Sequence, residues 1–259
     1  MIPAGFGNLE AQLWLWLLAM IRPGAAFLAA PVFGAPAVPV QLRLIVSLGV
    51  GMAALHASPI VMPAGGLFTL AGFVLILGEV LIGLALGFAV QIGFGAAMVA
   101  GETIGNTMGL GFAAMIDPGS GDSSPALGQL LSLLGTFMFL AIGGHLMLAQ
   151  IIVESYVTLP PGGPMLSGEA LKGLAMFGGS LFAMGLSIAL PVGFALVLVQ
   201  LIMGMLSRSA PALNLFSVGM PAALIAGIVL LAVMVPWMAD GIIEALQTGL
   251  AMADRLAGG

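Results

Sequence analysis

The chain has 259 residues, of which 61% are hydrophobic and only 6% are charged, and its mean hydropathy is +1.23. A soluble domain carries about a quarter charged residues, so this composition excludes a water-facing globular domain and predicts an integral membrane protein. The net charge of −5, with only five Lys and Arg residues, argues against a nucleic-acid surface, and the lack of cysteine excludes disulfides and thiolate sites.

Six apolar stretches follow one another along the chain, and we expect each to form a helix. The first is expected to be a membrane helix and not a cleavable leader, because no basic segment precedes it. The second is short for a full crossing. The third is longer than a simple span needs, so we expect it to tilt, kink or continue beyond the bilayer. The stretches cover residues 9–30, 40–55, 67–109, 126–157, 171–206 and 213–250.

Proline and glycine divide the second half of the chain. Pro191 lies inside the fifth stretch, which we expect to be either one bent helix or two short ones. The turn-forming segment 159–168 precedes that stretch and separates a part with four spans from a hairpin with two. The predicted division is therefore into residues 1–165 and residues 166–259.

Small residues recur at every fourth position near the end of the third stretch. On a helix this spacing places them on one face, where another backbone can approach closely. Glu102 lies beside this face, and an apolar segment and a turn at Asp117-Pro118 follow it. We expect this stretch to carry the function and to pack against partner subunits. The predicted helix-packing residues are Gly93, Ala97, Gly101, Glu102 and Gly105.

Ionisable side chains inside apolar stretches are costly in lipid and usually face protein or water. Glu79 and Glu102 have no basic residue at helical spacing, and His145 follows two glycines. Each residue could take part in a proton or ion relay, or could be hydrogen-bonded to a neighbouring helix or a partner subunit. We favour the second interpretation. These residues do not group as the three or four ligands of a metal site.

A serine nucleophile paired with His145 is the only enzymatic arrangement that the sequence suggests. Ser120, Ser123 and Ser124 lie in a turn rich in Pro and Gly, and a serine followed by Pro125 fits a helix N-cap followed by its first residue. We therefore expect no enzyme, no cofactor and no metal.

A resemblance to a known family is carried by residues along nearly the whole chain. Together they resemble the FliR family, whose members belong to the flagellar type III protein export gate; SctT is the injectisome counterpart. They are Arg22, Ala30–Gly34, Val38-Pro39, Arg43, Glu79, Gly83, Gly87, Ala100–Glu102, Gly105, Met108–Leu110, Phe112-Ala113, Asp117-Pro118, Gly144–Leu146, Ser155-Tyr156, Pro191, Arg208, Ala210-Pro211, Leu213-Asn214, Phe216, Gly219 and Pro221.

The resemblance implies a fold and partners. About six long, kinked helices are expected to pack as hairpins in a spiral assembly, with residues 1–165 similar to FliP and residues 166–259 similar to the FliQ hairpin. The implied partners are FliP-like, FliQ-like, FlhB-like and FlhA-like proteins, unfolded flagellar subunits and membrane lipid, in the bacterial inner membrane at the flagellar basal body. Ala212 and Thr107 depart from the glutamines expected there, which puts polar contacts at both positions in doubt. Arg208 and Asn214 join Glu79 and His145 as predicted buried polar residues.

By the same resemblance, a plug that closes the resting pore lies in the loop 109–122. Its apolar tip can exclude water and ions, and the flanking glycines can act as hinges. The predicted plug residues are Gly109, Leu110, Gly111, Phe112, Met115, Ile116 and Asp117.

Three other functions are alternatives to that of a flagellar gate subunit. An injectisome subunit of the SctT type shares the same resemblance. A secondary transporter would explain broken helices and buried carboxylates, but the chain has no inverted repeat. A membrane enzyme lacks a convergent nucleophile and base.

Overall fold

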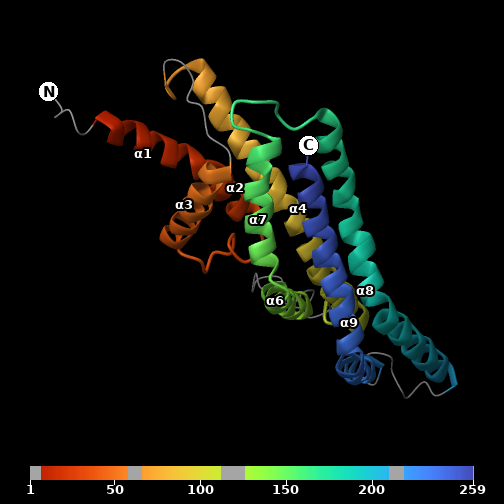
Figure 1. Cartoon of the computed structure of the whole chain (residues 1–259). Helices are drawn as coiled ribbons and strands as arrows, with labels where there is room; N and C mark the ends of the chain where they lie inside the picture. Colours follow the sequence, from red (N-terminus) through yellow and green to blue (C-terminus); the bar gives the residue numbers. More distant parts are fainter. Residues whose placement is uncertain (1–6, 58–65, 112–125, 210–218, 259) are drawn as a thin grey trace. The chain divides into compact units, whose positions relative to one another are not determined.

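The computed structural model describes residues 7–57, 66–111, 126–209 and 219–258, and within them every regular element is an α-helix (Figure 1). The predicted all-α membrane fold is confirmed. The helices are α1 (Gly7–Ala19), α2 (Ile21–Ala29), α3 (Val40–Ala57), α4 (Leu70–Met108), α6 (Ala126–Ala141), α7 (Gly144–Thr158), α8 (Gly168–Ser209) and α9 (Met220–Ala257).

Fewer of the described helices can cross a bilayer than the six apolar stretches suggest. Gln12–Ala29 in α1 and α2, and the helices α4, α8 and α9, are long and apolar enough, and α6 with α7 adds a fifth crossing if the pair counts as one span. The helix α3 is too short, as its sequence indicated. The fourth stretch is broken because Gly143 adopts a φ of 72°, a conformation that glycine tolerates best.

Capping side chains set the starts of the two long helices α4 and α8. The Thr69 hydroxyl accepts a hydrogen bond from the Gly72 amide at 3.2 Å, and the Ser167 hydroxyl accepts one from Ala170 at 3.1 Å. Each bond satisfies an amide that has no partner inside the helix. The 39 residues of α4 reach about 58 Å, roughly twice the hydrocarbon thickness of a bilayer.

The chain forms two compact units. The first contains residues 1–93, 140–178 and 246–259, and the second contains residues 94–139 and 179–245. In the first unit α2 packs on α3, α3 on α7, and α1 on both α2 and α3. Its core includes Leu18, Phe27, Leu86, Leu148 and Ile152.

The second unit is built around the end of α4. Gly185 of α8 lies against Val99, Gly227 of α9 lies against the Met108 side chain, and the Gln200 amide donates to the Thr107 carbonyl at 2.6 Å. Its core includes Ile104, Phe139, Ile188, Leu196, Met238 and Ile242.

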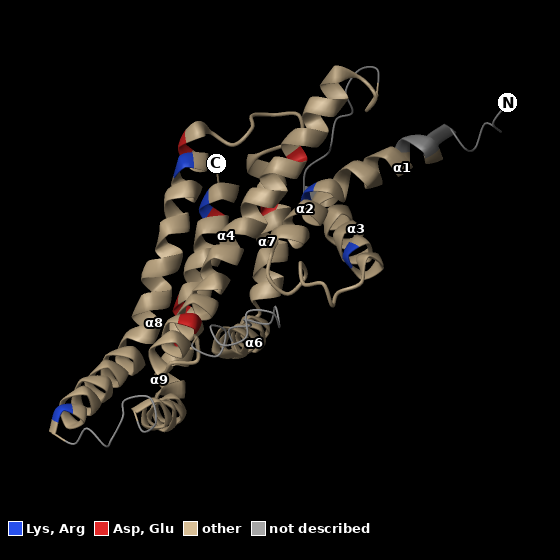
Figure 2. Cartoon of the chain, turned by 180° about the vertical axis from the view of Figure 1, so that it is seen from behind, with Lys and Arg blue, Asp and Glu red and all other residues tan. Residues whose placement is uncertain are grey.

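The fifth apolar stretch is a single 42-residue helix that contains Pro191, which decides between the two possibilities left open by the sequence. Charged side chains are sparse along the long helices (Figure 2). The predicted division into a FliP-like part, residues 1–165, and a FliQ-like hairpin, residues 166–259, stays a prediction.

Candidate functional site

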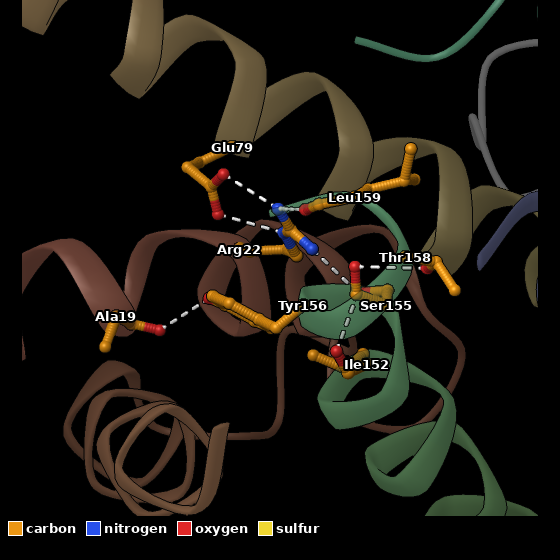
Figure 3. A network of polar contacts seen from close by, with 8 residues as sticks. All are labelled: Ala19, Arg22, Glu79, Ile152, Ser155, Tyr156, Thr158 and Leu159. Carbon is orange, nitrogen blue, oxygen red and sulfur yellow. Dashed lines mark hydrogen bonds and ion pairs between the residues drawn. The ribbon is translucent and has the colours of Figure 1, made fainter. Parts of the chain in front are cut away.

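Arg22 of α2 is the centre of a buried polar cluster in the first unit (Figure 3). Its side chain is 0% exposed and that of Glu79 on α4 is 2% exposed. The guanidinium donates from Nε to Glu79 Oε2 at 2.9 Å and from Nη2 to Glu79 Oε1 at 2.8 Å. The two parallel hydrogen bonds make a bidentate ion pair, in which two N–H groups of the guanidinium bind the two oxygens of one carboxylate.

The remaining donors of Arg22 reach the end of α7. Nη1 donates to Ser155 Oγ at 2.9 Å, and Nη2 also donates to the Leu159 carbonyl at 2.7 Å. The Tyr156 ring lies 4.0 Å from the guanidinium carbon, and the Tyr156 hydroxyl donates to the Ala19 carbonyl at 2.9 Å. The cluster therefore ties the α1–α2 region, α4 and α7 together, and the charge of Arg22 is balanced by Glu79.

The cluster is closed to solvent, so its role is to hold helices together and not to bind a ligand. A buried guanidinium whose hydrogen bonds go to protein atoms has no free face for a ligand. The helices approach closely enough to seal it because of two glycines on α4. A Cβ atom at Gly83 would lie 2.3 Å from the Arg22 carbonyl oxygen, and one at Gly87 would lie 2.1 Å from that of Ala26. Only residues without a side chain allow α2 to lie directly on α4.

Local sequence reasoning missed the Arg22–Glu79 pair. No basic residue lies within one or two helical turns of Glu79, and Arg22 is 57 positions away in the sequence. The favoured interpretation of a carboxylate bonded to a neighbouring helix describes what the structure shows for Glu79. The signal that could have found the pair was the resemblance, since Arg22, Glu79, Ser155 and Tyr156 all belong to the set of residues that carry it.

The small residues predicted to form a packing surface on α4 lie against other helices of the same chain at Gly93 and Gly101. A Cβ atom at Gly249 of α9 would lie 3.2 Å from the Gly93 Cα atom in the first unit. In the second unit, a Cβ atom at Gly101 would lie 2.5 Å from the Leu127 carbonyl oxygen of α6. Ala97 is buried, and Gly105 has only ordinary contacts, the nearest at 3.7 Å. A role of this face in binding partner subunits stays a prediction.

Glu102 is half-buried, and no hydrogen-bond partner for it is found among the described residues. Its predicted bond across a subunit interface cannot form within one chain, so that role also stays a prediction.

The start of the predicted plug forms the end of α4. Gly109 has a φ of 86°, its amide donates to the Asn106 carbonyl at 3.1 Å, and the Leu110 amide donates to the Gly105 carbonyl at 3.0 Å. This pair of bonds around a left-handed glycine is the Schellman motif, which ends a helix and turns the chain away from its axis. Gly111 is the last residue described here. Phe112, Met115, Ile116 and Asp117 lie outside the described residues.

The other predicted buried polar residues have different environments. His145 is half-buried at the start of α7, and its Nδ1 atom is buried without a hydrogen-bond partner in the part of the chain that the structure describes. Arg208 is exposed, so its predicted burial is not found within the chain. It lies in the last turn of α8, where a cation is favoured by the helix dipole and needs no buried partner. Asn214 lies outside the described residues.

The long apolar helices of the described residues define an all-α membrane protein. A buried ion pair holds several of these helices together. Residues 13–249 match the model of the family described as bacterial export proteins, family 1. The chain belongs to this family of export proteins, the FliR family.

Relatives that are named flagellar biosynthetic protein FliR support that membership. The flagellar biosynthetic protein FliR of Escherichia coli is 37% identical over 230 residues, which cover 88% of this chain and 86% of the relative. The protein of that name from Pectobacterium carotovorum is 36% identical and covers 83% of this chain and 82% of its own length. The one from Bacillus subtilis is 29% identical, with coverages of 84% and 85%.

Proposed function

We propose that the chain is a non-enzymatic subunit of the flagellar type III protein export gate. In this proposal it assembles with FliP-like and FliQ-like subunits into a channel for unfolded flagellar subunits in the inner membrane, next to FlhB-like and FlhA-like components. The observation that carries the proposal is the 37% identity to a flagellar biosynthetic protein FliR over 88% of the chain. The flagellar names of the relatives favour this proposal over an injectisome role.

Unpartnered helix faces support assembly with other subunits. On α8, a Cβ atom added at any of five glycines would meet no atom of the described residues within 4 Å, so another helix can approach its backbone there. These glycines are Gly168, Gly178, Gly179, Gly193 and Gly204. Large apolar side chains on the same helix are exposed as well, including Met176, Phe182, Phe194, Ile202 and Met205. Lipid or other helices must cover such a surface.

The end of α4 supports a plug in the loop 109–122. The Schellman motif at Gly109 directs the chain out of the helix and into this loop. The loop carries three large apolar side chains, at Phe112, Met115 and Ile116. An exported chain can displace an apolar tip by breaking contacts without breaking a salt bridge, which suits a gate that opens and recloses.

Purification of the assembled complex, followed by a leak assay, tests this function. The chain is co-expressed with its FliP-like and FliQ-like partners, extracted in mild detergent and reconstituted into vesicles loaded with a small ion. We expect a stable complex of three kinds of subunit that holds the ion. We also expect deletion of residues 109–116, or Phe112→Gly with Met115→Gly, to release it.

A matched control keeps the leak assay specific. Phe137→Gly with Met147→Gly changes the same residue types at exposed positions of α6 and α7 and should leave the complex tight. Purification of the chain alone or as a homo-oligomer, with both partners present, would contradict the gate. A complex that assembles but stays tight after the deletion would place the seal elsewhere.

A further inference from the structure

A side chain of α8 fastens the last turn of α4. Gln200 donates from its amide nitrogen to the Thr107 carbonyl at 2.6 Å, and both residues belong to the second unit. The acceptor is a main-chain atom, so the bond does not depend on which side chain stands at position 107. The Thr107 hydroxyl donates to the Thr103 carbonyl at 2.7 Å instead.

Each carbonyl at this helix end needs a donor from outside the regular helix ladder, because the last four carbonyls of a helix have no partner inside it. The Schellman motif at Gly109 supplies amides to the carbonyls of Gly105 and Asn106. The Thr107 carbonyl comes next, and Gln200 is its donor. A side chain of α8 therefore extends the cap that the chain of α4 makes by itself.

Gln200 stands in an apolar part of α8. It is the one polar residue in residues 191–206, and its neighbours Leu201 and Ile202 are exposed. An amide without a partner is costly in such surroundings, and a polar residue there usually makes a specific contact. The contact of Gln200 is the turn from which the predicted plug begins.

Met108, the last residue of α4, is held by α9. Its side chain is 3% exposed, and a Cβ atom at Gly227 would lie 2.6 Å from its Cγ and Cε atoms. The methionine therefore fills the space that this glycine leaves open. Gly109 has a φ of 86° and follows directly. The chain thus leaves α4 from a turn that α8 and α9 both hold.

We propose that Gln200 is a positioning residue for the plug, because its bond to Thr107 fixes the turn from which the loop 109–122 starts. This inference rests on the proposed function, in which that loop closes the resting pore. Without the bond, the last turn of α4 opens more often and the seal weakens. A glutamine that only satisfied its own amide would leave the seal unchanged.

Hydrogen exchange on the purified chain tests the first step without any partner. Gln200→Met keeps the length of the side chain and removes the donor. Loss of one hydrogen bond corresponds to about a three- to tenfold change in a local opening equilibrium. We therefore expect the amides of Gly109 and Leu110 to exchange about three- to tenfold faster. Gln247→Met changes an exposed glutamine of α9 in the same way and should have no effect.

The leak assay on the assembled complex tests the second step. With FliP-like and FliQ-like partners, Gln200→Met should assemble normally and release the small ion at least about threefold faster than the unchanged chain. Gln200→Lys should restore both slow exchange and a tight complex, because its ammonium can donate to the same carbonyl. Gln247→Met should again behave like the unchanged chain.

The outcomes separate this inference from the function on which it rests. Unchanged exchange at Gly109 and Leu110 in Gln200→Met overturns the inference and leaves the proposed gate intact. Faster exchange in a complex that stays tight also overturns it, because the turn then opens without affecting the seal. A complex that remains tight even after deletion of residues 109–116 contradicts the plug itself, and the role of Gln200 in the seal fails with it.

Discussion

Removal of one partner from the Arg22–Glu79 pair should cost far more stability than removal of both. Arg22→Met leaves the Glu79 carboxylate buried without its counter-charge, and Glu79→Leu leaves the guanidinium in the same situation. An uncompensated buried charge costs about 3–5 kcal/mol, so each single change should lower the free energy of unfolding by that amount.

The double variant leaves no charge behind. What remains is the loss of the bond to the Leu159 carbonyl and the Ser155 hydroxyl, which the arginine supplied. An unsatisfied buried acceptor costs about 1–3 kcal/mol, and Ser155 keeps its own bond to the Ile152 carbonyl. We therefore expect the double variant to be more stable than either single variant, with a coupling energy of at least about 3 kcal/mol.

Unfolding by SDS in mixed micelles, followed by far-ultraviolet circular dichroism, measures these free energies on the purified chain. Arg208→Met serves as the control, because the same change at an exposed arginine should cost less than about 0.5 kcal/mol. Glu79→Gln and Arg22→Lys are milder alternatives if a variant is too unstable to purify. The reasoning is refuted if the effects of Arg22→Met and Glu79→Leu simply add, or if each costs no more than Arg208→Met.

Two further changes address backbone packing and conformation, and the same SDS titration measures both. Gly101→Ala places a Cβ atom 2.5 Å from a carbonyl oxygen of α6 and should lower the free energy of unfolding by about 1–3 kcal/mol. Gly105→Ala serves as its control, because its Cβ atom meets only contacts of 3.7 Å or more and the change should be neutral or slightly stabilising. Equal effects of the two changes would contradict the packing described. Val32 has a φ of 69°, which costs a branched residue about 1–2 kcal/mol, so Val32→Gly should stabilise the chain by up to about 1 kcal/mol after the entropy of glycine is subtracted. Val38→Gly in the same segment should destabilise instead, and a loss of stability in Val32→Gly would show that the conformation carries no strain.

Composition and periodicity predicted the class of the protein and most of its helices. An apolar run of this length has to satisfy its backbone hydrogen bonds internally, so helices follow from the sequence alone. The starts of α3, α4 and α8 lie within three residues of the predicted apolar stretches, because Pro39, Thr69 and Ser167 act through local chemistry. The resemblance, also a property of the sequence, identified the family.

Tertiary structure decided which residues meet. Arg22 and Glu79 are 57 positions apart, and no local pattern reveals a pair that forms only after α2 has packed on the glycines of α4. The sequence left open whether the chain continues as one helix through Pro191, and the structure shows a single helix there. Short-range rules fix hydrogen bonds within a helix, whereas the position of a buried charge depends on where its counter-charge is brought by the packing of other helices.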